Sequence, residues 1–582
     1  MNLQKKYLRM ILIFIILITI GLLSQKYIVK NFIKNSNITK KTSLHIENFK
    51  DKKDFNDYLN KMKIKNKDSD YSYSSKLKSL SYKDDFSLNL KNTQLNSTNP
   101  ENDVVKTDDK YIYTAKIDSK STNNKLIIID SQNPKSLKKI TELNINGVIN
   151  KLYISDNKIT LISSIKEKDN TKVILSIYDK RDINSIKLER TVTYNGFFVD
   201  SFLDKNYLKI ITCNTLLPLL ADKTNDLDIN NYLPKYHDTT KNNETLIPIN
   251  QVTFCKEALR ENLITTSILN IADINSNIAT KTIMADNTDL YSTENTTLFA
   301  LNAYFDDNNT VTALINFPNS EEKLLETKTS FVKGKFLNQE SISYSNSNKT
   351  FEIATLYTFG EIFSHNVYIL NDKLETIGSI EGLAPNEVIH KAIFLKDKCY
   401  LTNKFENQPV YAIDLSTLEK PKLIKNLLVS DFKNACIQVN NNTFIGIGNE
   451  IDTLGEVKSN LKLSVFNLDD KGIPSEKFRN YFDYESDTSG IKTFYKGFYF
   501  NKKNNIVALK FDSFYNITLR PTITLAEIND KKVSNMRTFT MSECSYLNKS
   551  TITDINNNIF LITNSEIVVV DNNLNKISEL KL

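Results

Sequence analysis

The chain is 582 residues long and carries 75 Lys and Arg against 68 Asp and Glu, a net charge of +7 at pH 7. The basic residues do not cluster on one segment, which argues against a nucleic-acid-binding protein. One ordinary hydrophobic core does not support this length, but closed repeat folds escape the limit because each unit contacts only its neighbours. We therefore expect one large repeat domain and a smaller N-terminal region.

An apolar segment, MILIFIILITIGLL, spans residues 10–23 and follows Lys5, Lys6 and Arg9. It is short for a membrane span, yet no small-x-small cleavage site follows it, so we expect an uncleaved signal anchor within residues 1–30. Lysines after the segment nearly balance the basic residues before it. The charge rule therefore leaves its orientation open.

Residues 31–100 are expected to form a tether that contains one short helix at 51–67. Asp51 is a candidate N-cap for this helix. Four apolar side chains recur at helical spacing: Phe55, Tyr58, Leu59 and Met62. The pattern predicts an amphipathic helix that docks on its own β domain or on a partner, and docking on its own domain is the favoured alternative.

From residue 101 to 582 the sequence repeats one unit, in which an apolar, β-branched run ends on Asp or Asn and a Lys-rich run follows the turn. Most of these endings lie roughly 40 to 60 residues apart, the spacing of four-stranded propeller blades. The endings are Asp130, Asp179, Asp273, Asn371, Asp414, Asn467, Asn529 and Asp571.

Two intervals are about twice as long as the others. We interpret Asp179 to Asp273 as one blade with an insertion, and Asp273 to Asn371 as hiding a degenerate blade near residues 312–317. The units number eight or nine, and we expect eight because propellers usually have four to eight blades. The predicted fold is all-β, a β-propeller of about eight four-stranded blades preceded by a membrane helix and a short amphipathic helix.

The insertion, Asp222 to Pro248, is long and polar, and long loops without secondary structure are usually functional or disordered. We expect this insertion either to bind a ligand or to be a plain surface loop. The acidic lead into the domain, which ends in Asp108 and Asp109, is a second candidate, with a solvated turn as the alternative. The candidate ligand-binding residues are Tyr232, Pro234, Tyr236, Asp238 and Asp108.

Several segments carry a resemblance to a known family, among them DVVKTDDKYIY at 103–113, YLPKYHD at 232–238 and IGSIEGLAPNEVIHKAIFLKDKCYLTN at 377–403. The chain resembles secreted or membrane-anchored bacterial and archaeal proteins with a C-terminal β-propeller distantly related to WD repeats. The likeness covers roughly residues 45–582, and V-K-T-D and E-G-L-A-P are its most specific parts. Relatives usually carry glycine where Asp109 stands. The resemblance implies a propeller outside the cytoplasmic membrane.

Motifs for catalysis and for cofactors are missing from the sequence. There is no G-x-S-x-G, and His365 and His390 stand alone, so we predict no catalytic residue. Thirteen glycines and no tryptophan disfavour phosphate-binding loops and the sialidase-type and quinone-cofactor propellers. We predict no cofactor.

Metal-binding patterns are weak. The run Asp226, Asp228, Asn230 could start a calcium loop, but Asn231 replaces the turn glycine and the twelfth position is His237. The cysteines have no metal-ligand spacing and are predicted to be buried free thiols: Cys213, Cys255, Cys399, Cys436 and Cys544. We predict no metal site.

The favoured function is a single-pass, membrane-tethered extracellular propeller that acts as a binding or scaffold module for a protein, a peptide or a cell-envelope glycan. The alternative is an extracellular hydrolase whose carboxylates converge at the propeller channel, where paired acids from different blades need no local motif. A purely structural role in envelope assembly is a third possibility.

Overall fold

The computed structural model describes residues 44–67 and 104–582, apart from short stretches of the second range: 117–122, 168–169, 223–227, 307–308, 321–323, 325, 339–340, 360–361, 396, 404–409, 428–434, 439–441, 452–456, 470–472, 483–497, 502, 516–517, 529–532, 543–550 and 564. The expected signal anchor at 1–30 and most of the tether lie outside the described residues. Within the described part, no helix is both long enough and apolar enough to span a membrane.

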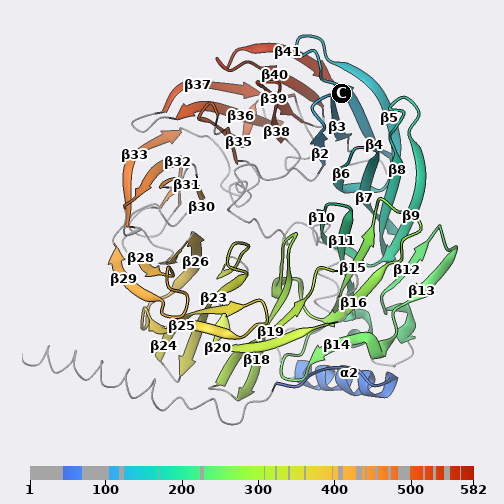
Figure 1. Ribbon diagram of the computed structural model, residues 1–582, viewed down its shortest axis with the longest axis vertical. Coiled ribbons are helices and arrows are strands. Elements are labelled where there is room, and N and C mark those ends of the chain that lie inside the picture. The colour runs from blue at the N-terminus through green and yellow to red at the C-terminus, as the bar shows by residue number, and fades with distance from the viewer. Residues whose placement is uncertain are drawn as a thin grey trace, which may run out of the picture.

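Nine sheets of the described residues stand side by side in a ring, and each sheet is one blade of a β-propeller (Figure 1). Their strands pair antiparallel, except for one parallel pair at the outer edge of blade 3. Blade 1 comprises β2 (Val105–Thr107), β3 (Tyr111–Lys116), β4 (Asn123–Asp130) and β5 (Lys138–Asn146). Blade 2 begins with β6 (Val148–Ile154), β7 (Lys158–Glu167), β8 (Asn170–Asp179) and β9 (Lys187–Asn195). Blade 3 is built on β10 (Phe197–Asp204), β11 (Tyr207–Thr215), β15 (Asn262–Asn270) and β16 (Ala279–Met284).

Blades 4 to 6 follow in chain order. Blade 4 comprises β17 (Leu290–Ser292), β18 (Thr297–Asp306), β19 (Asn309–Phe317) and β20 (Lys328–Lys333). Blade 5 comprises β21 (Lys335–Phe336), β22 (Ile342–Ser345), β23 (Thr350–Phe359), β24 (Ile362–Asn371) and β25 (Thr376–Leu383). Blade 6 comprises β26 (Ile389–Leu395), β27 (Lys398–Asn403), β28 (Val410–Asp414) and β29 (Lys422–Leu427).

Blades 7 to 9 complete the ring. Blade 7 comprises β30 (Ala435–Gln438), β31 (Thr443–Ile451), β32 (Val457–Leu468) and β33 (Pro474–Phe482). Blade 8 comprises β34 (Phe498–Asn501), β35 (Ile506–Tyr515), β36 (Thr518–Ile528) and β37 (Val533–Thr540). Blade 9 comprises β38 (Thr551–Ile555), β39 (Asn558–Ile562), β40 (Glu566–Val570) and β41 (Lys576–Lys581). Among the strands named here for each blade, the first lies innermost and the last lies furthest out (Figure 1).

The expected count of eight blades is wrong, because the described residues form nine sheets. The degenerate unit near residues 312–317 is a full blade, blade 4. Its third strand, β19, ends on Phe317 and is followed by Pro318, so the Asp or Asn that marks the other blades is missing. The usual upper limit for propellers, and not the strand pattern, led to the lower number.

The Asp or Asn at the end of the third strand closes a turn with its own side chain. The Oδ1 atom of Asp130 accepts the backbone N–H of Gln132 at 3.0 Å. The same bond recurs from the equivalent residues of other blades, Asp179, Asn371, Asp414 and Asp571, at 2.9–3.0 Å. Asx turns of this kind direct the chain into the outer strand. In blade 3 the residue is Asn270, not the expected Asp273, which lies three residues further on.

Apolar clusters fill the space between neighbouring sheets, and they run around the whole ring. Blade 9 packs on blade 1 through Phe560 and Val569 against Ile112 and Ile127. The Lys116 ammonium also donates to the carbonyl oxygen of Leu582 at 2.8 Å. Packing of the last blade on the first therefore closes the ring. The three described cysteine side chains, Cys213, Cys255 and Cys399, are buried free thiols, as predicted.

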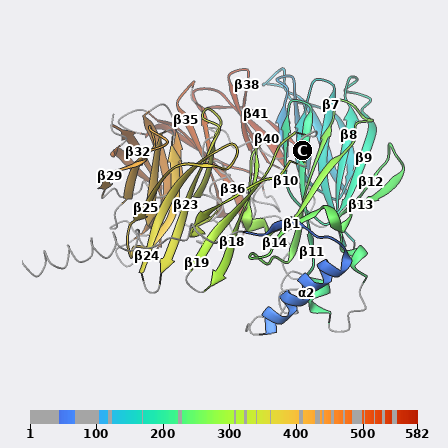
Figure 2. The same cartoon turned by 60° about the horizontal axis from the view of Figure 1, so that its bottom comes forward.

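Residues 44–67 dock on blade 3. Strand β1 (Ile46–Asn48) pairs with β14 (Val252–Cys255), and helix α2 (Lys52–Lys67) follows where the sequence predicts a helix. Figure 2 shows α2 projecting from the ring beside β14 and β11. The Phe49 ring stacks on Phe254 with the ring centres 4.0 Å apart, and the apolar face of α2 is buried. The helix therefore docks on its own β domain, as predicted by the favoured of the two alternatives.

Single glycines carry the chain from one blade to the next at three crossings. Gly147, Gly196 and Gly334 have φ values of +85°, +98° and +90°, in the left-handed region that L side chains rarely adopt. Each also packs against a backbone carbonyl of the next blade. A Cβ atom on Gly147 would lie 2.4 Å from the Ser164 carbonyl oxygen.

Replacing Gly147 by Ala should therefore destabilise the protein by about 2 to 4 kcal/mol, from the left-handed conformation and the steric clash together. The matched control is Asn144→Ala on β5, the strand just before this crossing, where the side chain is exposed. Urea unfolding of both variants measures the difference. Equal midpoints for the two would show that the crossing tolerates a side chain.

Candidate functional site

The insertion lies inside blade 3, between its second strand β11 and its third strand β15. The whole segment between these two strands contains α4 (Leu217–Ala221), η2 (Ile229–Asn231), β12 (Lys235–Asp238), β13 (Asn243–Leu246), η3 (Ile249–Gln251) and β14. Of these, η2, β12 and β13 lie within the insertion at 222–248. Strand β12 pairs with β9, so β12 and β13 extend blade 2 to six strands. The expectation of a long loop without secondary structure is wrong, because the described part of the insertion is a hairpin on the outer edge of blade 2.

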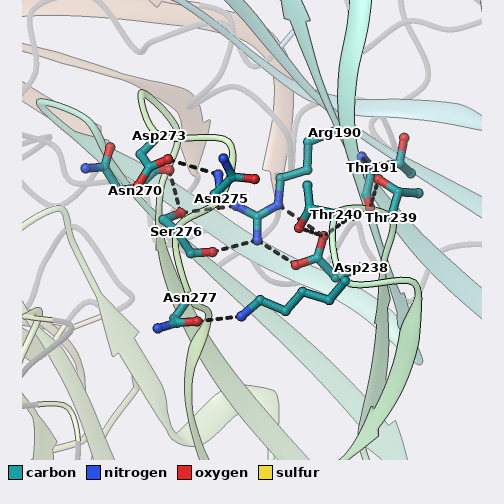
Figure 3. A network of polar contacts seen from close by, with 11 residues as sticks. Arg190, Thr191, Asp238, Thr239, Thr240, Asn270, Asp273, Asn275, Ser276 and Asn277 are labelled. Atoms are coloured by element: carbon teal, nitrogen blue, oxygen red, sulfur yellow. Dashed lines mark hydrogen bonds and ion pairs between the residues drawn. The ribbon is translucent and has the colours of Figure 1, made fainter.

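Asp238 holds this hairpin to the propeller through a buried ion pair with Arg190 of β9 (Figure 3). The Nη2 atom of Arg190 lies 2.7 Å from Asp238 Oδ2, and Nε lies 3.2 Å from Oδ1. The two side chains are 0% and 1% exposed. Asp238 also accepts the N–H and the hydroxyl of Thr240 at 3.1 and 2.9 Å. Both carboxylate oxygens are therefore occupied by the protein itself.

The same guanidinium joins the hairpin to blade 3. Arg190 donates to the hydroxyl of Ser276 at 3.1 Å and to its carbonyl oxygen at 2.9 Å (Figure 3). Burial raises the pKa of Asp238, but hydrogen bonds from Arg190 and Thr240 outweigh burial, so the pKa lies below its ordinary value. We name the group of Arg190, Asp238, Thr240 and Ser276 the rim clasp.

The other candidate residues of the insertion support its fold. Pro234 is buried, and its carbonyl oxygen accepts the N–H of Ile247 at 2.9 Å across the hairpin. The Tyr236 ring packs on Tyr194 of β9, with ring centres 5.9 Å apart. Tyr232 ends η2 and packs on the cluster beneath α2. Asp228 caps η2 by accepting the N–H of Asn230, and Asp226 lies outside the described residues.

Asp108 lies in blade 1, apart from the insertion, and closes the turn between β2 and β3. Its carboxylate accepts the Tyr111 N–H at 3.0 Å, the Tyr113 hydroxyl at 2.8 Å and the Lys180 ammonium of blade 2 at 2.9 Å. Burial raises its pKa, but these partners lower it below the ordinary value. Asp109 has φ +69°, a left-handed conformation that glycine adopts more readily than other residues. The V-K-T-D motif is thus strand β2 followed by the first residue of the turn, and Asp108 joins blades 1 and 2.

Carboxylates near the channel are relevant to the hydrolase alternative. Asp200 lies on β10, the innermost strand of blade 3, and its Oδ1 atom is 2.9 Å from the Lys151 ammonium on β6. The ammonium also lies 5.0 Å from the centre of the Phe202 ring. Such a lysine neutralises the carboxylate and joins blades 2 and 3, so this arrangement does not support acid–base chemistry.

Among the blade crossings that the structure describes in full, two are longer than the single-glycine ones, and both carry acidic residues. Between blades 3 and 4, η4 (Asn287–Asp289) contains Asp289, which accepts two hydrogen bonds from Arg260 at 2.6 and 3.0 Å. Between blades 5 and 6, residues 384–388 follow Glu381 and contain Glu387. None of these acids was a candidate from the sequence, although Glu381 is the first residue of the specific E-G-L-A-P motif and Glu387 lies two residues after it.

Comparison with known proteins agrees with the architecture. The chain matches the family described as "Beta propeller domain" over residues 92–581. It belongs to that family. This beta propeller domain protein is similar to two archaeal proteins. It is 31% identical over 154 residues to the uncharacterized protein MJ1554 of Methanocaldococcus jannaschii, and 30% identical over 148 residues to an uncharacterized protein of Archaeoglobus fulgidus. These matches cover 26% and 25% of this chain, and they span 24% and 22% of the two relatives.

Solved structures show only distant similarity to this beta propeller domain protein. KlHsv2 with loop 6CD replaced by a Gly-Ser linker and a point mutant of Synechocystis apocarotenoid oxygenase both give a TM-score of 0.26 at 10% identity. They cover 66% and 55% of this chain, and 99% and 84% of their own lengths. At this TM-score neither similarity carries an argument.

Replacing Asp238 by Ala leaves the Arg190 guanidinium buried without its carboxylate, so we expect a loss of about 3 to 5 kcal/mol in urea unfolding. The matched control is Glu244→Ala, which breaks the exposed 3.1 Å ion pair with Lys235 on the same hairpin and should cost at most about 1 kcal/mol. Equal losses would contradict the assignment of the clasp as the element that holds the hairpin.

The pH dependence gives a second readout of the same pair. The folded-state pKa of Asp238 is lowered, so its contribution to stability is complete above the unfolded pKa of about 4 and is lost as the pH falls through the folded value. The stabilities of the wild type and of Asp238→Ala should therefore converge in acid, and a constant difference would contradict the lowered pKa.

Proposed function

We propose that this protein is a binding module that captures an extended segment of a protein partner at the outer edge of blade 2. The observation that carries the proposal is the β12–β13 hairpin. Its inner strand is held by a fully buried ion pair, whereas its outer strand β13 is mostly exposed. Among the described strands none pairs with the outer edge of β13. A rigid, exposed strand edge is the element to which an extended peptide adds as a further strand.

Side chains on the hairpin supply the features that such a partner would meet. Leu246 on β13 is 41% exposed, and the ion pair of Lys235 and Glu244 lies beside it. Backbone hydrogen bonds would give affinity, and these side chains would set specificity. A cell-envelope glycan is the other partner class that the sequence favours, and it remains an outcome of the test below.

The proposal includes a membrane tether, with the propeller outside the cell. Its support is the apolar segment at 10–23 and the resemblance to membrane-anchored propeller proteins. Residues 44–67 follow this segment and dock on blade 3, which neighbours the hairpin. A tethered module would thus present the blade 2 edge close to the point where its anchor joins the ring.

The test is capture from a cell-envelope extract with residues 40–582 as bait, read by mass spectrometry and glycan analysis. Deleting 222–248 would be a poor variant, because the deletion removes Asp238 and leaves Arg190 buried without its carboxylate. We choose Leu246→Lys, which places a charge on the edge strand and opposes strand addition.

The matched control is Leu423→Lys on the outer strand of blade 6, where the leucine is 43% exposed. We expect one protein species to be captured by the wild type and by the control, and its recovery to fall at least about tenfold with Leu246→Lys. Equal recovery with all three baits would reject the blade 2 edge as the binding surface. A glycan in place of a protein would reject strand addition.

A further inference from the structure

The E-G-L-A-P crossing between blades 5 and 6 holds two glutamates in closely similar settings. Glu381 lies near the end of β25, and Glu387 lies in the loop before β26. Each carboxylate accepts the hydroxyl of a tyrosine on the third strand of a blade: Tyr368 of blade 5 donates to Glu381, and Tyr411 of blade 6 donates to Glu387. The two sites differ in what meets the other carboxylate oxygen.

At the first site that oxygen meets a cation from the protein. Glu381 Oε1 lies 2.9 Å from the Tyr368 hydroxyl, and Oε2 lies 3.3 Å from the Lys333 ammonium. The same ammonium lies 5.3 Å from the centre of the Tyr357 ring. Glu381 is therefore neutralised by a lysine of blade 4.

At the second site no cation meets the carboxylate among the described residues. Glu387 Oε1 accepts the Tyr411 hydroxyl, but Oε2 has only a long contact of 3.5 Å with the amide nitrogen of Asn403. Asn403 is 1% exposed, and its carbonyl oxygen Oδ1 has no hydrogen-bond partner. A buried carbonyl oxygen without a partner costs stability unless a ligand satisfies it.

We propose that Glu387 and Asn403 bind a primary ammonium group from outside the chain, in the role that Lys333 has at Glu381. The available atoms are all acceptors: both oxygens of Glu387, Oδ1 of Asn403, and the hydroxyl oxygen of Tyr411. The Tyr411 hydroxyl already donates its proton to Glu387. An ammonium group offers three donors and one positive charge, which complements this set.

The surroundings favour an alkylammonium over a metal ion. Val388 is 70% exposed next to Glu387 and, with the exposed Pro385, offers an apolar surface for an alkyl chain. Calcium requires six to eight oxygen ligands, more than these residues supply. No group of three or more His, Cys, Asp or Glu side chains in the described chain could hold a metal ion. The ammonium has two sources, a lysine side chain of a partner protein or a free polyamine.

This site is separate from the blade 2 edge and stands without the proposed function. The test is a titration at pH 7.5 followed by saturation-transfer NMR, with acetyl-Gly-Lys-Gly-amide and cadaverine as ammonium probes. A peptide with norleucine in place of lysine is the apolar control. We expect the wild type to bind at least one ammonium probe and not the norleucine peptide. Binding of the lysine peptide alone indicates a protein partner, and binding of cadaverine alone indicates a free polyamine.

Two variants test the residues. Glu387→Gln should weaken binding at least about tenfold, whereas the matched control Glu381→Gln, whose carboxylate already has Lys333, should leave it unchanged. Val388→Lys changes an exposed side chain and supplies an internal ammonium, so it should compete with the probe without disturbing the fold. Failure of both probes to bind, equal binding of the norleucine peptide, calcium binding that Glu387→Gln abolishes, or equal losses from the two glutamine variants would each overturn the proposal.

Discussion

Face-to-face packing of neighbouring sheets is the interaction on which the rest of this structure depends. A four-stranded sheet of this sequence is apolar on its two faces near the centre, as in β4, where Leu126 to Ile129 are all fully buried. Such a sheet cannot be stable alone, and it buries both faces only when a blade stands on each side. Closure of blade 9 on blade 1 supplies the last of these contacts, so the C-terminal residues matter as much as the first blade.

Two local devices repeat around the ring and fix how blades connect. Asx turns end the third strands, and single glycines in left-handed conformation start new blades where the crossing is shortest. Both devices are tightly constrained and leave little freedom for function. The chain departs from both devices at the insertion in blade 3 and at the acidic crossings after blades 3 and 5. Residues there are therefore less constrained by the fold and are the better candidates for a binding role.

The sequence predicted the architecture well because the repeated run that ends on Asp or Asn reflects a local bond, that of Asp130 to its own turn. It failed at blade 4, where Phe317 and Pro318 replace that signal, and in the count of blades, which followed a general limit. Helix α2 was predictable since Phe55 and Tyr58 recur at its period. The fold of the insertion was not predictable, because β12 pairs with a strand about 45 residues earlier, and no local pattern encodes such a pairing.

The candidate residues show why a polar cluster in a sequence is weak support for a binding site. Asp238 was a candidate because it lies in a long polar insertion, and Asp108 because it lies in an acidic lead. In the structure Arg190 and Lys180 occupy their carboxylates. Their partners lie 48 and 72 residues away in the chain, so only the folded ring shows that these charges are neutralised. The useful observation is the opposite one, an acceptor that the protein leaves without a partner. Comparing Glu381 with Glu387 reveals such a site. Both carboxylates accept a tyrosine hydroxyl, but a lysine ammonium meets only Glu381.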